Sequence, residues 1–227
     1  KLDPDVTTYG AGVTVCEKGG QWQHALFLLE ELRRAELQAD VIICNAAVSA
    51  CEKSGQWQRA LSVLCEMMEE RMEPDAISYN AGISACEKGG QWQQALLLLR
   101  ELREADLAPD ILSYNAGISA CEKRMQWEMS LALLSELRGE MLEADVITYH
   151  AAVSACKKGW HWREAVSLLR EMGGAALEPD VASYNAVIQA CAGGAGGQWQ
   201  RALSLLSEML GAKVEPNIFS YSAGISA

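Results

Sequence analysis

Hydrophobic positions in this chain alternate between two helical patterns. Residues 91–104 place apolar side chains at a spacing of i, i+3, i+4, i+7 and i+10: Trp92, Ala95, Leu96, Leu99 and Leu102. This spacing predicts an amphipathic helix with one apolar stripe. The preceding stretch, residues 76–88, also predicts a helix, but its small residues indicate close packing against a neighbour. Gly89-Gly90 separates the two stretches, as a glycine at a helix C-terminus would. Residues 76–104 therefore predict a helical hairpin.

The hairpin recurs along the whole chain. Six cysteines lie 35 residues apart: Cys16, Cys51, Cys86, Cys121, Cys156 and Cys191. A tryptophan follows each of the first five after six residues, and the sixth after eight, because residues 192–197 carry two extra residues. A period in the mid-thirties predicts a stacked array of repeats. We expect one all-α array over residues 1–227, with the end of a preceding repeat at 1–5, repeats one to six at 6–40, 41–75, 76–110, 111–145, 146–180 and 181–217, and a truncated repeat at 218–227.

Composition narrows the classes of function. Half of the 227 residues are hydrophobic, yet no apolar run approaches the length of a membrane span, so no membrane partner is expected. Equivalent cysteines on stacked hairpins should lie ~8–10 Å apart, beyond the ~7 Å limit for a disulfide, so we interpret them as small buried residues in a reducing compartment. The three histidines lack metal-ligand spacing, and neither a nucleophile–base set nor a glycine-rich phosphate loop is present. We expect no cofactor and no enzymatic activity.

The repeat resembles a known family. A 35-residue hairpin with Ser-Tyr-Asn at the head of its first helix and Pro-Asp at its end is similar to the P-type pentatricopeptide repeat, here in six units in register. The tetratricopeptide repeat is the alternative, but it has a period of 34 and a tryptophan in its first helix, whereas tryptophan begins the second helix here. The resemblance implies a right-handed superhelical solenoid that binds single-stranded RNA with one base per repeat.

The resemblance also implies which residues read the bases. In the family, the fifth and the last residue of a repeat recognise the base. From repeat one to repeat six these pairs are Gly10 with Asp40, Asn45 with Asp75, Asn80 with Asp110, Asn115 with Asp145, His150 with Asp180, and Asn185 with Asn217. Asn with Asp resembles a uracil reader, and Asn with Asn a cytosine or pyrimidine reader, whereas Gly10 and His150 are not usual reading residues. The implied preference is N-U-U-U-N-C/U.

Two further positions are implied to contact the RNA. The second residue of a repeat sandwiches the base, and four aliphatic side chains stand there: Ile42, Ile77, Leu112 and Ile147. Thr7 and Ala182 hold the same position in repeats one and six. A lysine late in the first helix meets the phosphates, and five recur: Lys18, Lys53, Lys88, Lys123 and Lys158. Each can neutralise about one phosphate.

Each of these residues also has a purely structural interpretation. An aspartate before a helix is a good N-cap, contributing ~1 kcal/mol. The asparagines could be solvated polar residues, and the Glu-Lys pairs, such as Glu17-Lys18, could be ordinary surface charges. The tryptophans are expected to pack in the core or between repeats. Replacing Asp110 by Asn separates capping from base reading, because both residues cap a helix.

Charge argues against strong nucleic-acid binding. The formal net charge is −11, although most acidic residues lie in the second helices and the loops after them. We expect weak, salt-sensitive binding of U-rich single-stranded RNA, of micromolar affinity or weaker. The family resemblance implies a role in the processing, stability or translation of chloroplast or mitochondrial transcripts, with other RNA-processing proteins as further partners. The alternative is a protein-binding helical scaffold. The N-terminal residues lack the layout of a targeting peptide, and no pattern sets an oligomeric state.

Overall fold

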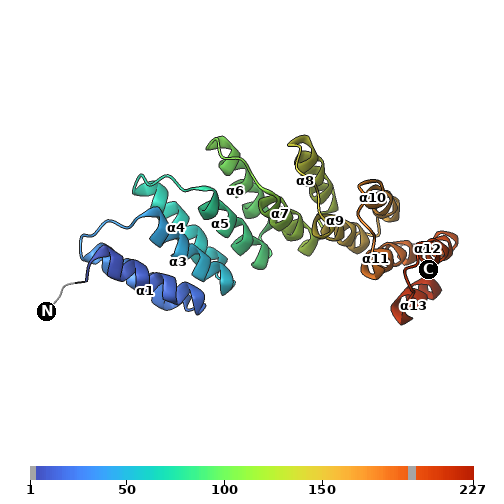
Figure 1. The fold of residues 1–227 in the computed structure, drawn as a ribbon, viewed down its shortest axis with the longest axis horizontal. Coiled ribbons are helices and arrows are strands. Elements are labelled where there is room, and N and C mark those ends of the chain that lie inside the picture. Colours follow the sequence, from blue (N-terminus) through green and yellow to red (C-terminus); the bar gives the residue numbers. More distant parts are fainter. Residues whose placement is uncertain (1–3, 194–197) are drawn as a thin grey trace. The chain divides into compact units, whose positions relative to one another are not determined.

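A computed structural model describes residues 4–193 and 198–227, which form thirteen α-helices and no strand (Figure 1). The first helices of the hairpins are α1 (Val6–Lys18), α3 (Val41–Lys53), α5 (Ala76–Lys88), α7 (Ile111–Lys123), α9 (Val146–Lys158), α11 (Val181–Ala192) and α13 (Ile218–Ser226). The second helices are α2 (Trp22–Arg34), α4 (Trp57–Glu69), α6 (Trp92–Glu104), α8 (Trp127–Gly139), α10 (Trp162–Gly174) and α12 (Trp199–Gly211). The predicted all-α fold of repeated helical hairpins is confirmed.

The helix ends follow from the repeated residues. An aspartate or asparagine precedes each first helix, and in α5 the Asp75 carboxylate accepts the backbone N–H of Ser78 at 2.8 Å. Between the hairpin helices, Gly90 has a φ of 64°, the left-handed conformation that glycine adopts without steric cost. Met125 and Trp160 hold the same repeat position with φ of 59° and 60°. The turn geometry is therefore kept even where glycine is absent.

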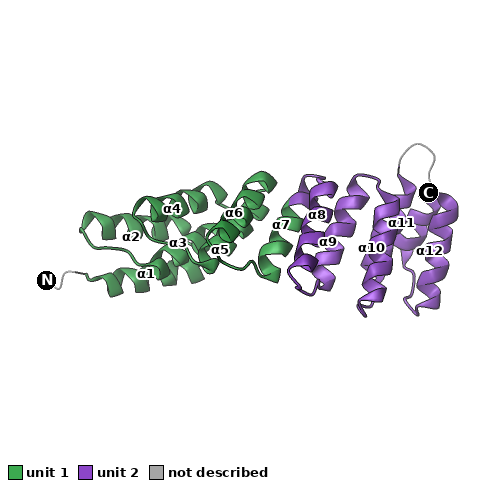
Figure 2. Cartoon of the chain, turned by 90° about the horizontal axis from the view of Figure 1, so that it is seen from above, with its two compact units in different colours: residues 1–120 green, residues 121–227 purple. Residues whose placement is uncertain are grey.

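The chain forms two compact units, residues 1–120 and residues 121–227 (Figure 2). Within the first unit, α1 packs against α3 and α3 against α5, while each also packs against its own second helix. Within the second unit, α9, α11 and α13 are neighbours in the same way. Each unit is thus a stack of hairpins whose first helices lie side by side.

Small residues permit this close stacking. A Cβ added to Gly82, in the middle of α5, would lie 2.6 Å from Cδ1 of Leu64 in α4 and 3.1 Å from Cδ1 of Leu98 in α6. Two leucines of successive second helices therefore meet over this glycine. Glycine at this position costs ~1 kcal/mol of helix propensity relative to alanine. It allows Leu64 and Leu98 to approach the backbone of α5 more closely than a larger residue would permit.

The repeated cysteines and tryptophans are packing residues. All eight cysteines are free, and five of the six periodic ones are buried, Cys16 being half-buried. Burial raises the pKa of Cys86 to about 12, which keeps its thiol protonated and inert. A Cβ at Gly89 would lie 2.3 Å from Trp57, so this ring covers the hairpin turn of the next repeat. Trp127 stacks on His161 with ring centroids 3.8 Å apart. These contacts join one repeat to the next.

Two short segments of the expected repeats are not described by the structure, and the described residues contain neither a membrane-spanning helix nor a metal-binding group. Residues 1–3 of the expected repeat end lie outside the described part of the chain. So do residues 194–197, which belong to the stretch 192–197 that carries the two extra residues of repeat six. Within residues 4–193 and 198–227, no helix is long and apolar enough to cross a membrane. In the same residues, no group of three or more His, Cys, Asp or Glu side chains could hold a metal ion.

Candidate RNA interface

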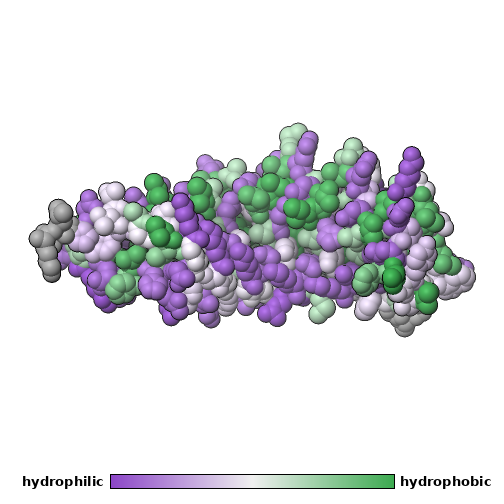
Figure 3. Space-filling model, turned by 60° about the horizontal axis from the view of Figure 1, so that its bottom comes forward, coloured by the Kyte–Doolittle hydropathy of each residue, from purple (hydrophilic) through white to green (hydrophobic). Residues whose placement is uncertain are grey.

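Three predicted contact residues of repeat two, Ile42, Asn45 and Asp75, line one hollow together with Ile77 of repeat three. Ile42 lies in α3 and Ile77 in α5. Ile42 is 74% exposed and Ile77 66% exposed, which is unusual for large aliphatic side chains at matching positions of successive repeats. On the face shown in Figure 3, exposed hydrophobic side chains interrupt a hydrophilic surface. The second, fifth and last positions of this repeat therefore converge on one open slot.

The two reading residues of repeat two are bonded to each other. Asn45 Nδ2 donates a hydrogen bond to Asp75 Oδ1 at 3.0 Å, while Ser78 Oγ donates to Asn45 Oδ1 at 2.5 Å. Burial raises the pKa of Asp75, but hydrogen bonds from Ser78 and Asn45 to the carboxylate outweigh it, and the pKa lies below its usual value. Asp75 is therefore an ionised N-cap and the partner of Asn45 at the same time, so the capping and the base-reading interpretations do not exclude each other.

Repeat three repeats this arrangement. Asn80 Nδ2 donates to Asp110 Oδ2 at 3.1 Å, and Ser113 Oγ donates to Asn80 Oδ1 at 2.5 Å. Asp110 caps α7 through the backbone N–H of Ser113 at 2.8 Å. Leu112, at the second position of the next repeat, is 67% exposed like its counterparts. The asparagines are thus held by neighbours and are not simply solvated.

The last residues of repeats four and five also cap the helices that follow them. Asn115 belongs to the first unit and Asp145 to the second, where Asp145 caps α9 through the backbone N–H of Thr148 at 2.8 Å. In repeat five, Asp180 accepts the backbone N–H of Ser183 at 2.8 Å. Burial raises the pKa of Asp180, but its bonds to Ser183 and the nearby His150 lower it below the usual value. Ile147, the flanking aliphatic residue, is 67% exposed.

Repeat six differs from repeats two and three at its last residue. Asn185 Nδ2 donates to Asn217 Oδ1 at a longer 3.3 Å. Ser220 Oγ donates to Asn217 Oδ1 at 3.1 Å, and the buried Asn185 Oδ1 has no hydrogen-bond partner among the described residues. Replacing the carboxylate by an amide therefore leaves the reading asparagine less firmly held.

Repeat one lacks a reading side chain altogether. Asp40 caps α3 through the backbone N–H of Ile43 at 2.8 Å. A Cβ at Gly10 would lie 3.2 Å from Ile43 Cγ1, so the isoleucine lies close to the place an amide would take. The hollow at this repeat is lined by Thr7, Gly10, Asp40, Ile42 and Ile43, among other residues. Repeat one thus has Ile43 near the place where repeats two and three have the amide of an asparagine.

The repeated lysines Lys53, Lys88 and Lys158 form ion pairs with glutamates of the preceding repeat. Lys53 Nζ lies 2.8 Å from Glu17 Oε1, and the pairs Lys88–Glu52 and Lys158–Glu122 measure 2.5 and 2.8 Å. In each pair the glutamate belongs to the preceding repeat, not to the adjacent position in the sequence. The bond from Lys53 is the main cause that lowers the pKa of Glu17. Lys18 and Lys123 end α1 and α7 at the same repeat position. The ammonium groups of Lys53, Lys88 and Lys158 are therefore each engaged by a glutamate of the preceding repeat.

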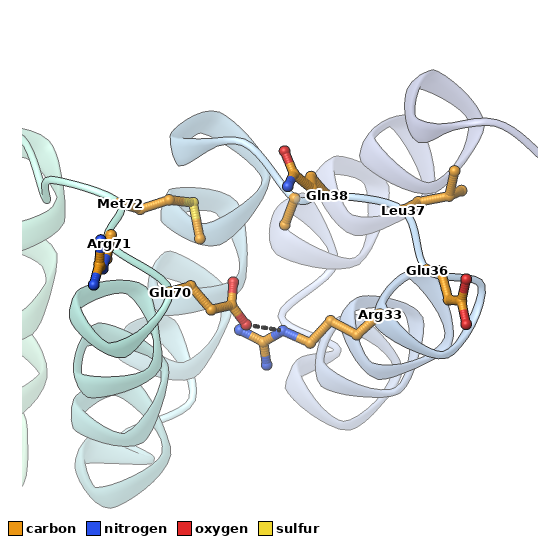
Figure 4. Close-up of a pocket in the computed structure, with 8 residues that line it drawn as sticks. Arg33, Glu36, Leu37, Gln38, Glu70, Arg71 and Met72 are labelled. Carbon is orange, nitrogen blue, oxygen red and sulfur yellow. Dashed lines mark ion pairs between the residues drawn. The ribbon is translucent and has the colours of Figure 1, made fainter.

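A further hollow lies away from these slots, where the loop after α2 meets the end of α4 (Figure 4). Arg33 Nε pairs there with Glu70 Oε1 at 2.9 Å, and the same guanidinium pairs with Glu66. None of the residues predicted to read bases lines this hollow. Its charged groups connect repeats one and two.

Sequence reasoning overlooked two kinds of residue. The first is the buried hydroxyl that contacts the reading asparagine, as Ser78 and Ser113 do. The serine of the repeated Ser-Tyr-Asn motif is the sequence feature that could have indicated this contact. The second is Phe219, which is 69% exposed at the second position of the truncated repeat. By analogy with Ile77 it flanks the slot of Asn185 and Asn217, and counting positions into residues 218–227 would have found it.

Family models of pentatricopeptide repeats match several stretches of the chain. Family models described as "Pentatricopeptide repeat domain", "PPR repeat family" and "PPR repeat" match residues 27–89, residues 144–193, and residues 77–107 with 182–214, respectively. No curated protein matches the chain.

Solved structures of similar fold include a pentatricopeptide repeat protein and a proteinaceous RNase P. The pentatricopeptide repeat protein PPR10 from maize is 23% identical, with a TM-score of 0.70 over 99% of this chain and 32% of its own. PPR10 in complex with an 18-nucleotide psaJ RNA element is 22% identical, with a TM-score of 0.57 over 99% of this chain and 36% of its own. The nuclear proteinaceous RNase P 2 from A. thaliana is 11% identical, with a TM-score of 0.75 over 87% of this chain and 46% of its own.

The chain thus spans about a third of the length of PPR10, and at these identities the likeness shows the fold alone. The assignment to a family rests on the matched repeat models and on the regular 35-residue spacing of the helical hairpins from α1 to α11. This chain belongs to the pentatricopeptide repeat family.

Proposed function

We propose that this chain binds single-stranded RNA along its first helices, one base per repeat, with the preference N-U-U-U-N-C/U from repeat one to repeat six. The observation that carries the proposal is the slot of repeat two, where two exposed aliphatic side chains line one hollow with a bonded Asn45–Asp75 pair. The complex of the similarly folded PPR10 with an RNA element adds support.

The slot matches a base in shape and in polarity. The exposed Ile42 and Ile77 offer apolar surfaces to the two faces of a flat ring, which gains from leaving water. After its bond to Asp75, Asn45 Nδ2 has one more hydrogen to donate, and its Oδ1 has one more lone pair. Uracil presents an N3–H donor beside carbonyl acceptors, so a donor and an acceptor side by side suit its edge. Repeats three and four carry the same pair of residue types.

The remaining repeats fit weaker or different preferences. Repeat one has Ile43 near the place of the amide, and repeat five offers an imidazole in place of an amide, so neither is assigned a base. In repeat six the last residue is an amide, and Asn185 is held by a longer bond of 3.3 Å to Asn217 Oδ1. This arrangement supports the C/U assignment.

Electrostatics sets the strength of binding. The three ion-paired lysines carry no net charge together with their glutamates. A phosphate must therefore compete with a carboxylate for each lysine, and few counterions are released from the RNA. We propose weak binding that depends mainly on base contacts. The chain would act in organellar RNA processing, stability or translation by occupying RNA without catalysis, alongside other RNA-processing proteins.

The test exchanges a single atom group at repeat three. A gel shift at low salt compares U-rich with A-rich single strands, and then strands with U or C at the base facing Asn80. We expect Asp110→Asn to move preference from U toward C, because the amide still caps α7 but alters the partner of Asn80. Asp106→Asn is the matched control, since Asp106 is an exposed loop residue outside every slot.

The competing function is a protein-binding scaffold, which the net charge of −11 favours. Absence of binding to any of these strands at tens of micromolar protein would support the scaffold. Binding without a change of preference in Asp110→Asn would refute base reading by Asp110.

A further inference from the structure

We propose that the buried hydroxyl at the third position of a repeat is a positioning residue that sets the base specificity of the preceding repeat. This inference rests on the proposed function. The hydroxyls concerned, which we call third-position hydroxyls, belong to Ser78, Ser113, Thr148, Ser183 and Ser220. The reading unit then comprises three side chains from two repeats.

The geometry in repeat two shows how the hydroxyl acts. The backbone N–H of Asp75 donates to Ser78 Oγ at 3.1 Å, so the hydroxyl oxygen is already an acceptor. Its single proton then lies toward Asn45 Oδ1, which at 2.5 Å is the nearer of its two acceptors. On the other side, the Asp75 carboxylate can only accept, and it takes Asn45 Nδ2. Both neighbours therefore favour the same orientation of the amide.

A rotated amide would lose its bond to Asp75. Turning the Asn45 side-chain amide over would point Oδ1 at the Asp75 carboxylate, and Ser78 Oγ would have to turn its proton from Asn45 to Asp75 before it could accept from Nδ2. Oxygen facing a carboxylate is repulsive, because neither atom carries a proton. The orientation matters for recognition, because a rotated amide would interchange the donor and the acceptor offered to the base. Uracil and cytosine differ in this order of donor and acceptor at N3 and the exocyclic group.

Burial makes the hydroxyl hard to replace. Ser78 has 0% and Ser113 1% of its surface exposed. Water therefore cannot reach the carbonyl end of the asparagine amide from the side of the hydroxyl, and loss of the hydroxyl would leave that acceptor unsatisfied there. In repeat three Ser113 Oγ likewise donates to Asn80 Oδ1 at 2.5 Å and accepts the backbone N–H of Asp110 at 3.2 Å, so the arrangement is not peculiar to one site.

The chain itself separates this role from helix capping. Asp40 caps α3 through a 2.8 Å bond to the backbone of Ile43, so a helix of this array begins well without a third-position hydroxyl. The slot that this isoleucine adjoins is the one whose reading residue is Gly10, which has no amide to orient. In repeat six, where Asn217 replaces the aspartate, the hydroxyl of Ser220 bonds to Asn217 and Asn185 Oδ1 is unpartnered. The hydroxyl contacts the amide in repeats two and three, where the pair is Asn with Asp.

The experiment measures base discrimination in the 227-residue chain. Dissociation constants are determined for strands that differ only in U or C at the base facing Asn45. We expect Ser78→Ala to lower the ratio of U to C affinity about fivefold, the worth of one ordinary hydrogen bond. Ser78→Thr should keep the ratio, since threonine stands at this position as Thr148. The matched control is Ser84→Ala on the same helix, whose hydroxyl bonds to Glu52 instead.

A second readout needs no RNA. The side-chain amide resonances of Asn45 in nitrogen–proton correlation spectra report its hydrogen bonds. We expect them to shift in Ser78→Ala and to stay in place in Ser84→Ala. Unchanged resonances would overturn the proposed contact.

The outcomes distinguish the inference from the function on which it rests. If Ser78→Ala weakens binding of both strands equally, the hydroxyl only supports the fold, and the inference is wrong. If the unsubstituted chain binds and Asp110→Asn changes its preference, but Ser78→Ala leaves the ratio unchanged, the inference alone fails. If the unsubstituted chain binds neither strand, the proposed function fails and this inference with it.

Discussion

Replacing Met125 by glycine is expected to stabilise the chain although it removes a hydrophobic side chain. Met125 lies in the turn between α7 and α8 with a φ of 59°, where Gly20, Gly55 and Gly90 stand in the first three repeats. The left-handed conformation costs a residue with a Cβ ~1–2 kcal/mol, which glycine avoids. Glycine in turn lowers stability by ~0.5–1 kcal/mol, because it has greater conformational freedom in the unfolded chain. The Met125 side chain is 59% exposed, so little packing is lost. The net gain is therefore ~0.5–1 kcal/mol.

Thermal unfolding followed by circular dichroism measures this gain. An increase of ~0.5–1 kcal/mol raises Tm by roughly 1–4 °C in a chain of this length. Met125→Ala is the control, because it removes the same side chain and keeps the conformational cost, so its Tm should not rise. Trp160→Gly has the same φ relief, but the Trp160 ring lies where a Cβ of Gly193 would be, 1.4 Å from Cε3, and its loss should destabilise. A Tm of Met125→Gly at or below that of Met125→Ala would refute the reasoning.

Two further predictions concern charge. Glu52→Gln should free Lys88 from its 2.5 Å ion pair, raise RNA affinity at low salt and steepen the salt dependence by about 0.7 in the logarithmic slope; an unchanged slope in a salt titration would show that Lys88 does not meet phosphate. Asp75 has a lowered pKa, since its hydrogen bonds outweigh burial, so its contribution to stability is present above its unfolded pKa of ~4 and is lost as pH falls through the folded value. Urea unfolding from neutral to acidic pH should therefore show a smaller loss in Asp75→Asn than in the parent, and equal losses would contradict the ionised cap.

The fold could be predicted from the sequence because its signals recur from repeat to repeat. The amphipathic stripe of residues 91–104, the aspartate or asparagine before each first helix and the glycine after most of these helices agree with one another in register. This agreement places the start of α6 within one residue, at Trp92. Met125 shows that one repeat alone would not predict this turn, since methionine is not expected in a left-handed conformation. Only the neighbouring repeats, with glycine at that position, predict the turn.

The site could be predicted less completely, since its contacts cross between repeats. The sequence shows Glu17 beside Lys18, yet residues adjacent on a helix do not face each other, and Glu17 pairs with Lys53 of the next repeat. The contact between Ser78 and Asn45 likewise depends on the distance between two first helices, which periodicity does not supply. The family resemblance indicated the reading positions, but not what holds their side chains in place.

The double role of the last residue limits which residues can stand there. Asp75 accepts the N–H of Ser78 that begins α5 and the amide of Asn45 that would read the base, both through Oδ1. A substitution at this position therefore changes stability unless the new residue also caps a helix. The residues that do so well are Asp, Asn, Ser and Thr. In this chain the position is Asp in five repeats and Asn in the sixth. The choice of base at this position is thus drawn from the residues that can begin a helix, so specificity can change between repeats while the helix caps are kept.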